Sequence, residues 1–212
     1  MQECCRLMQA LWMSQTTTAS QVPPGPGGGK PPRHWAIIKD AFSSEECARL
    51  SEAFSELDAH EGGLVAGRFD RKVRQSALVW LPEEDAFDWV EQRITRLAGD
   101  ANREVFRYLL DGFEEQLQLA LYGPGHYYNW HIDRGRGAVA GRRKLTLSVQ
   151  LSDPADYVGG ELELNADGHP FQVPVDQGAM VVFPAHTLHR VAPVVSGSRL
   201  SLVSWIHGPD FV

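Results

Sequence analysis

Cysteine is scarce in this sequence of 212 residues, which contains only Cys4, Cys5 and Cys47. Two adjacent cysteines and one distant cysteine cannot build the cross-linked framework of a small secreted domain, nor a zinc site made of cysteines. The scarcity therefore favours a reducing compartment, and we expect the protein in the cytoplasm.

Long hydrophobic runs are also missing. No apolar stretch approaches the roughly 18–20 residues of a membrane span. The opening segment MQECCRLMQALWMSQ is short, weakly basic and without a clear cleavage site, so no signal peptide is predicted. These features exclude a membrane as an expected partner.

Positive charge is in the minority. The sequence has 20 Lys and Arg against 27 Asp and Glu, which gives a net charge of −7. Proteins that bind nucleic acid without sequence specificity rely on a positive field. We therefore do not expect DNA or RNA as a partner.

Core-forming residues are nearly absent from residues 14–33, where proline and glycine dominate. Such a segment cannot bury enough apolar surface to offset the entropy lost on ordering. Residues 1–33 are therefore predicted to be a flexible tail. The remainder, residues 34–212, is long enough for one domain with a hydrophobic core.

Within this domain the hydrophobic pattern predicts helices first and strands afterwards. The predicted elements are a strand at 35–40, a helix at 43–57 with a capping box of Ser43 and Glu46, a strand at 73–81, a second helix opened by Pro82, and short strands after about residue 103. This order predicts a mainly β domain, a sandwich or barrel with helices packed on one side.

Two of the predicted strands alternate strictly. In residues 144–151 the aliphatic residues share one face, and Thr146, Ser148 and Gln150 share the other; residues 117–122 alternate in the same way. One explanation is an antiparallel sheet with a solvated face. The other is that helices cover the apolar face while the small polar face lines a ligand cavity.

A candidate metal site begins at His131 and Asp133, which lie two residues apart in an expected strand and therefore face the same side. Alone, such a tripeptide occurs often by chance. A further histidine from a distant strand would complete a site of two histidines and one carboxylate for Fe(II), with open positions for substrate, co-substrate and O2. His189, 58 residues after His131, is the candidate.

Arg199 follows His189 by ten residues and shares a strand face with Ser201, Val203 and Trp205. An arginine that projects into a barrel interior is costly unless it meets an anion. The planar guanidinium suits a carboxylate held by two parallel hydrogen bonds. Taken singly, a hydrogen-bonded core histidine and an internal Arg–Glu pair are the commoner explanations; the joint order and spacing favour the site.

These residues resemble the 2-oxoglutarate- and Fe(II)-dependent oxygenases, and most closely their prolyl/lysyl-hydroxylase-like (PKHD-type) branch. The resemblance covers about residues 35–210 and includes the segments 73–81, 122–133, 144–164, 183–194 and 199–209. It implies a double-stranded β-helix, which is a jelly-roll or cupin-like barrel, with two N-terminal helices packed on one sheet.

The resemblance also implies roles for individual residues. His131, Asp133 and His189 would bind iron, and Arg199 would bind the distal carboxylate of 2-oxoglutarate. Tyr122 would hydrogen-bond the co-substrate, and Trp205 would line the iron site. Further candidates for contact with the co-substrate, from the inner face of the barrel, are Ser201, Gln150 and Thr146. Relatives often place a hydroxyphenyl group near residues 144–151, where this chain has none. The implied cofactors are Fe(II), 2-oxoglutarate and O2, with ascorbate as a reductant.

The implied activity is hydroxylation of an unactivated C–H bond with release of succinate and CO2. We expect a small molecule or amino acid as substrate. A prolyl or other residue within a peptide or protein is the alternative, and a non-catalytic cupin-like metal-binding or sensing module is a second one, which the Arg199 clamp disfavours.

Two segments bear on substrate access. Residues 134–144 carry five cations, and are either a solvated loop or a lid that attracts an anionic substrate. The glycines of residues 60–74 suit either a closing loop or a plain turn.

His60 and His207 have no partner at ligand spacing and receive no role. The oligomeric state is not predicted.

Overall fold

The computed structural model describes residues 34–62, 64–65, 68–69, 73–174 and 176–210. The tail predicted at residues 1–33 lies outside this range, as do parts of the glycine-rich segment 60–74. None of the described helices is long and apolar enough to cross a membrane.

The first helix, α2 (Ser44–Glu56), begins where the capping box predicts. The Ser43 hydroxyl accepts a hydrogen bond from the Glu46 N–H at 3.3 Å, and the Glu46 carboxylate accepts one from the Ser43 N–H at 2.9 Å. Its apolar face buries Cys47 and Leu50, so the predicted helix and its start are confirmed.

The second helix, α3 (Asp88–Ala101), starts later than predicted. Pro82 does not open it: the chain first makes two turns, in which the Glu84 N–H donates to the Pro82 carbonyl and the Phe87 N–H to the Glu84 carbonyl. The intervening residues 83–86 are exposed and mostly acidic. The helix forms only where its apolar residues, among them Val90 and Ile94, reach the core, because packing supplies most of a helix's stability.

The remaining described elements are strands and short helical turns. They are β1 (Ala36–Ile38), β2 (His60–Gly62), β3 (Leu64–Val65), β4 (Arg68–Phe69), β5 (Arg74–Trp80), η1 (Asn102–Phe106), β6 (Gln118–Tyr122), β7 (Tyr127–His131), η2 (Ala140–Arg142), β8 (Arg143–Gln150), η3 (Pro154–Asp156), β9 (Tyr157–Gly159), β10 (Leu162–Asn165), β11 (Phe171–Gln172), β12 (Met180–Pro184), β13 (Leu188–Val191), β14 (Val194–Gly197) and β15 (Arg199–His207).

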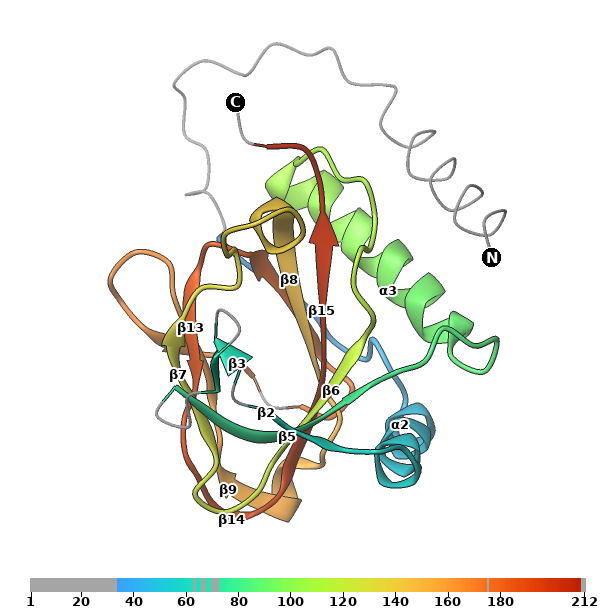
Figure 1. The fold of residues 1–212 in the computed structure, drawn as a ribbon, viewed down its shortest axis with the longest axis vertical. Helices are drawn as coiled ribbons and strands as arrows, with labels where there is room; N and C mark the ends of the chain where they lie inside the picture. Colours follow the sequence, from blue (N-terminus) through green and yellow to red (C-terminus); the bar gives the residue numbers. More distant parts are fainter. Residues whose placement is uncertain (1–33, 63, 66–67, 70–72, 175, 211–212) are drawn as a thin grey trace.

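Most of these strands form one curled antiparallel sheet (Figure 1). Its order is β1-β12-β8-β15-β6-β5-β7-β13-β10-β11, with β2 added beside β5. The sheet turns at β5, which pairs with β6 through Ala77–Trp80 and with β7 through Arg74 and Gln75. One strand therefore belongs to both walls of the barrel.

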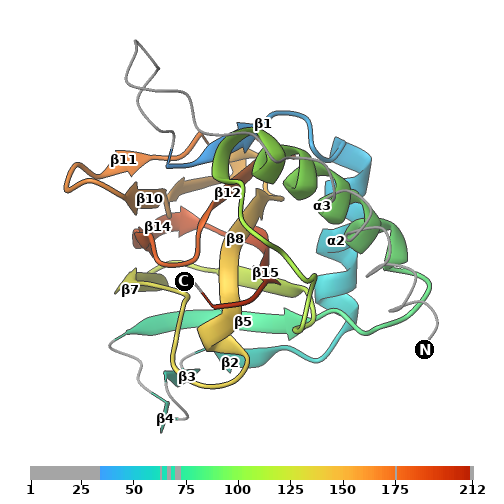
Figure 2. The ribbon, with the colours of Figure 1, turned by 90° about the horizontal axis from the view of Figure 1, so that it is seen from above.

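The two helices cover only one wall. Seen from above, α2 and α3 lie on the same side of the curled sheet, and β7, β10 and β11 lie on the opposite side (Figure 2). Leu145, Leu147 and Val149 of β8 are buried in the core that also contains residues of both helices, such as Leu50 and Ile94. The mainly β fold with helices on one side is therefore confirmed.

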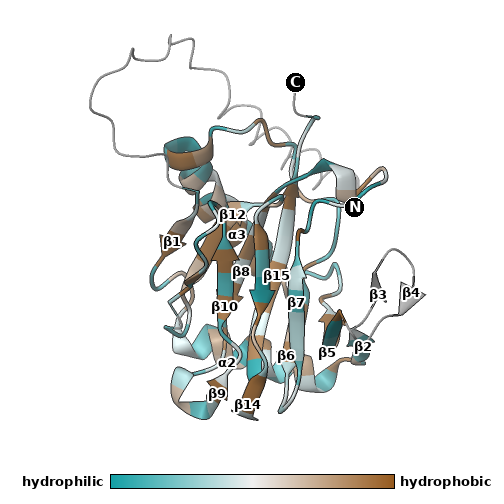
Figure 3. Ribbon diagram, turned by 90° about the vertical axis from the view of Figure 1, so that its left-hand side faces the viewer, coloured by the Kyte–Doolittle hydropathy of each residue, from teal (hydrophilic) through white to brown (hydrophobic). Residues whose placement is uncertain are grey.

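The inner face of the barrel is lined differently. A second apolar cluster, which includes Tyr122, Leu164 and Phe183, lies between the two walls. Strand β7 has the sequence YYNWH, without an aliphatic residue, and it is pale to hydrophilic along its length (Figure 3). A strand with this composition can contribute to a polar cavity, because its ring and amide groups offer hydrogen-bonding partners.

Candidate active site

A cavity of about 440 Å³ lies between the two walls. Among the residues that line it are the predicted site residues Tyr122, His131, Asp133, Thr146, His189, Arg199, Ser201 and Trp205. The polar face of the alternating strands therefore lines a ligand cavity, and the simpler explanation of a solvated sheet face does not hold.

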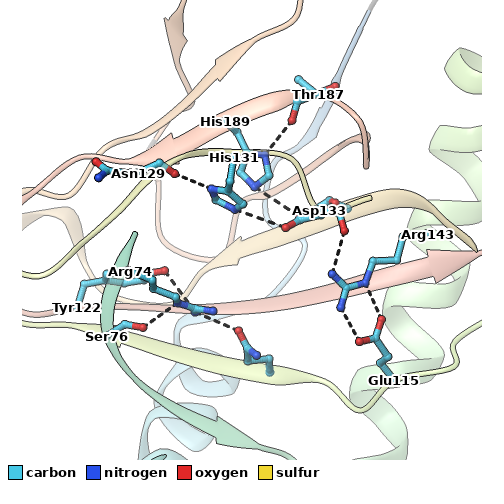
Figure 4. A network of polar contacts seen from close by, with 12 residues as sticks. Arg74, Ser76, Glu115, Tyr122, Asn129, His131, Asp133, Arg143, Thr187 and His189 are labelled. Atoms are coloured by element: carbon cyan, nitrogen blue, oxygen red, sulfur yellow. Dashed lines mark hydrogen bonds and ion pairs between the residues drawn. The ribbon is translucent and has the colours of Figure 1, made fainter. Parts of the chain in front are cut away.

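The two histidines are brought together by strand pairing. His131 ends β7, and the register between β7 and β13 sets it opposite His189. Asp133 follows just beyond the strand, where its N–H donates to the Ala185 carbonyl at 2.9 Å. One carboxylate oxygen lies 3.5 Å from His131 Nε2 and the other 3.4 Å from His189 Nε2. Residues 58 positions apart thus form one cluster (Figure 4).

Both imidazoles are oriented by the main chain. His131 Nδ1 donates to the Asn129 carbonyl at 2.7 Å, and His189 Nδ1 donates to the Thr187 carbonyl at 2.9 Å. These bonds leave each Nε2 lone pair directed at the space beside Asp133. One ligand atom from each of the three residues lies within 4.8 Å of the others. Two imidazoles and a carboxylate with fixed orientation fit a divalent iron ion.

The electrostatics of the cluster favour a cation. Burial alone would raise the pKa of Asp133, but His189 and His131 outweigh it and hold that pKa well below its ordinary value. Burial lowers the pKa of His131, whereas in His189 the charge and hydrogen bond of Asp133 outweigh burial and raise the pKa. An ionised carboxylate next to a neutral imidazole is the protonation state that metal binding requires.

Thr146 holds the carboxylate in place. Its hydroxyl donates to Asp133 Oδ2 at 2.8 Å in a buried position. From the sequence, Thr146 is one of the less favoured candidates for contact with the co-substrate. In the structure its hydroxyl is hydrogen-bonded to Asp133 instead.

The Thr146→Val variant is expected to bind Mn(II) about 10–100-fold more weakly, because loss of a hydrogen-bond partner of a metal ligand has an effect of this size. Titration calorimetry under anaerobic conditions measures the affinity. Ser148→Ala, on the same strand face, is the matched control. An unchanged affinity in Thr146→Val would contradict a positioning role.

Arg199 is a buried cation that pairs with no carboxylate of the described residues. It is 3 % exposed, its Nε has no hydrogen-bond partner, and Nη1 donates weakly to Ser201 at 3.5 Å. Room for the side chain comes from Gly160, at φ +69°, where a Cβ would lie 3.2 Å from Arg199 Cδ and 2.8 Å from Val194 Cγ2. A buried guanidinium with an unused donor fits a bound anion.

Gln150 does not line the main cavity. It lies beside a much smaller one, and its amide donates to the Tyr157 hydroxyl at 3.1 Å and to the Ser152 carbonyl at 3.1 Å. Burial raises the pKa of Tyr157, and the charge of Arg199 opposes that shift. A hydroxyphenyl group thus does approach Arg199, but it belongs to Tyr157, which lies after residues 144–151.

A second polar network was not anticipated. The Arg143 guanidinium donates to both carboxylate oxygens of Glu115 at 2.5 and 2.6 Å, and to the Asp133 carbonyl at 3.0 Å. It stacks on the Trp205 ring at 3.8 Å. His207, which is fully buried, contacts Glu115 at 3.1 Å. The network ties the cavity wall to the loop that carries Asp133.

This network should make stability depend on pH. Burial would raise the pKa of Glu115, but hydrogen bonds from His207 and Arg143 outweigh it and lower the pKa to about 2. Because the folded pKa lies below the ordinary value of 4.5, the stabilisation is present above that value and is lost as pH falls from there toward 2. By about pH 3 the loss should reach about 2 kcal/mol.

The Glu115→Gln variant should lack this part of the pH dependence. The free energy of unfolding, measured by urea titration at several pH values, checks the prediction. Glu104→Gln, on the exposed surface, controls for the general effect of losing one carboxylate. A parallel decline of Glu115→Gln and wild type would contradict it.

The cations of residues 134–144 are largely engaged within the protein. Arg134 pairs with Asp210, Arg142 with Asp111 and Glu114, and Arg143 with Glu115. These pairs reduce the positive field that a lid for anionic substrates would need. The cavity instead contains Arg74, a cation to which the sequence gave no role. Arg74 shares one face of β5 with Ser76 and Leu78. This spacing of two residues could have indicated that Arg74 faces the cavity.

Comparison with known proteins identifies the chemistry. Residues 117–207 match the model of the 2OG-Fe(II) oxygenase superfamily. A PKHD-type hydroxylase of Hyphomonas neptunium is 28% identical over 178 residues, with 80% of this chain and 76% of the relative covered. One from Xanthomonas axonopodis pv. citri is 29% identical over 182 residues, covering 79% and 76%.

Solved structures agree in fold. A Pseudomonas putida prolyl-4-hydroxylase superposes with a TM-score of 0.68 at 21% identity, covering 96% of this chain and all of that one. A viral collagen prolyl hydroxylase from Paramecium Bursaria Chlorella virus-1 superposes with a TM-score of 0.62 at 25% identity, covering 84% and 97%. The double-stranded β-helix is therefore confirmed.

The family model covers all three clustered ligand residues and Arg199, and the PKHD-type relatives extend the similarity over most of the chain. These findings favour an enzyme over a non-catalytic cupin-like module. The chain contains a region that matches the 2OG-Fe(II) oxygenase superfamily and is similar to PKHD-type hydroxylases over 80% of its length, and it is a dioxygenase of the hydroxylase type that uses Fe(II), 2-oxoglutarate and O2.

Proposed function

We propose that His131, Asp133 and His189 bind Fe(II), and that Arg199 binds the distal carboxylate of 2-oxoglutarate. This assignment is carried by the convergence of three ligand atoms within 4.8 Å of one another at the cavity. The same cavity is lined by the buried Arg199 guanidinium, which has no carboxylate partner among the residues that the structure describes. When bound, the iron and 2-oxoglutarate supply the oxidising chemistry, in which O2 is consumed, succinate and CO2 are released, and a C–H bond is hydroxylated.

The other cavity residues orient the co-substrate. Arg74 Nη2 donates to the Tyr122 hydroxyl at 3.5 Å, which leaves the Tyr122 O–H able to donate to a carboxylate. Ser201 lies beside Arg199 and offers a second hydroxyl. Trp205 lies under the Arg143 guanidinium at 3.8 Å and forms part of the cavity wall.

The substrate is a small molecule or amino acid in this proposal. A cavity of about 440 Å³ is of the size that encloses small ligands, and 2-oxoglutarate must share it. The enzyme supplies placement, because the C–H bond held nearest the metal is the one that reacts. The alternative, a prolyl or other residue of a peptide, gains support from the prolyl hydroxylases among the similar structures, one of which is in complex with a hypoxia inducible factor peptide.

A consumption screen decides between these substrates. Purified enzyme with Fe(II) and 2-oxoglutarate is offered amino acids, metabolites and prolyl peptides, and mass spectrometry detects the gain of one oxygen atom. We expect a small molecule to gain oxygen and to stimulate succinate formation. A response confined to peptides would overturn the preference for small molecules.

We also propose that residues 34–212 form the catalytic domain, that ascorbate serves as reductant, and that the enzyme acts in the cytoplasm. The first is supported by an apolar core formed by residues from Ala36 to Ile206. The others are supported by the requirement for ferrous iron and by the buried thiol of Cys47, which is free.

A further inference from the structure

The cavity contains three guanidinium groups with different partners. Arg143 is neutralised by Glu115, and Arg199 is reserved for 2-oxoglutarate in the proposed function. Among the described residues Arg74 has neutral partners only: Nε donates to the Ser76 hydroxyl at 2.8 Å, and Nη2 donates to the Gln118 side-chain oxygen at 3.1 Å and to the Tyr122 hydroxyl at 3.5 Å. No carboxylate of the described residues pairs with it.

The position of Arg74 is fixed by the sheet corner. Strand pairing sets it opposite Tyr128, and its guanidinium lies over the Tyr128 ring at 4.7 Å. The other neighbour of that ring is the His131 imidazole, with ring centroids 3.4 Å apart. One aromatic ring therefore separates Arg74 from the proposed metal ligand His131, and Figure 4 shows Arg74 facing the cluster from β5.

The hydrogen bonds of Arg74 orient it without satisfying it. Ser76, Gln118 and Tyr122 occupy the donors of Nε and Nη2, whereas the two N–H groups of Nη1 have no acceptor among the described residues. An oriented guanidinium with open donors is suited to a carboxylate, since charge-assisted hydrogen bonds are about twice as strong as neutral ones.

We propose that Arg74 binds a carboxylate of the molecule that is hydroxylated, so that the substrate is a small carboxylic acid such as a free amino acid. The inference rests on the proposed function, because it assigns Arg199 rather than Arg74 to 2-oxoglutarate. Tyr122 links the two subsites: its backbone pairs with Arg199 and its hydroxyl contacts Arg74.

A comparison of acids with their amides tests the proposal on the wild-type enzyme. The probes are the L-amino acids, their N-acetyl derivatives and the corresponding C-terminal amides. Anaerobic calorimetry measures their binding to the enzyme loaded with Mn(II) and 2-oxoglutarate, and CO2 release measures stimulation with Fe(II). At least one acid should bind and stimulate, and its amide should bind at least about tenfold more weakly.

Variants then assign the effect to Arg74. Arg74→Gln should raise the dissociation constant of that acid more than tenfold, and Arg74→Lys, which keeps the charge but loses the planar donor set, should raise it less. The dissociation constant of 2-oxoglutarate, measured in the same way, should change far less than that of the acid. Arg96→Gln, the same change on the exposed surface of α3, is the matched control.

Three results would overturn the proposal: equal binding of acids and amides, binding of no acid, or an Arg74→Gln effect confined to 2-oxoglutarate. The last would assign Arg74 to the co-substrate. Failure of the proposed function is recognised separately, because it would show as absence of 2-oxoglutarate turnover in the wild-type enzyme without any added probe.

Discussion

Replacement of Asp133 by alanine is expected to reduce the release of labelled CO2 from 2-oxoglutarate to below about one hundredth of the wild-type rate. The carboxylate is buried, and it faces the Nε2 atoms of both histidines at 3.5 and 3.4 Å. Because loss of a mere hydrogen-bond partner of a ligand costs about 10–100-fold, loss of a ligand itself should cost at least as much.

The measurement is capture of labelled CO2, together with calorimetric titration by Mn(II), which should no longer detect a site. Asp156→Ala removes a carboxylate from the exposed surface and serves as the control. Circular dichroism verifies that both variants fold. Turnover of Asp133→Ala at the wild-type rate, with a folded protein, would refute the proposed metal site.

Replacement of Arg199 by methionine should have two opposite effects. The KM for 2-oxoglutarate should rise at least about a hundredfold, since removal of one partner of a buried, hydrogen-bonded ion pair costs about 3–5 kcal/mol. The ligand-free protein should become more stable by about 1–3 kcal/mol, because the variant no longer buries a charge for which the described part of the chain supplies no carboxylate partner.

Steady-state kinetics with varied 2-oxoglutarate and thermal unfolding without ligand check the two effects separately. Arg199→Lys retains the charge but not the paired donors, and should give an intermediate KM. A structural role alone predicts lower stability of Arg199→Met with an unchanged KM, which is the contrary outcome.

Several features of the fold could be predicted because they depend on local pattern. The start of α2 follows from the bonds between Ser43 and Glu46, which are three residues apart. The two faces of β8 and β15 follow from alternation with a period of two. The start of α3 could not be predicted in this way, since it depends on where the chain after Pro82 reaches the core rather than on the proline itself.

The polar networks of the cavity were outside the reach of such patterns. Glu115 and His207 are 92 residues apart, and Arg74 and Gln118 are 44 apart. Neither pair has a spacing that indicates contact. From the sequence, residues 134–144 could be either a solvated loop or a lid that attracts an anion, and the structure shows most of their cations bound to nearby acids.

The amino-acid sequence by itself determined the reaction chemistry of this protein. A histidine and a carboxylate two positions apart in an extended strand must face the same side, and a second histidine with an arginine ten residues later completes a recognisable donor set. Only the tertiary structure decided which cations of the cavity are neutralised. Ion pairing depends on distances across paired strands, and those distances are set by the curl of the sheet at β5 and not by the order of residues along the chain.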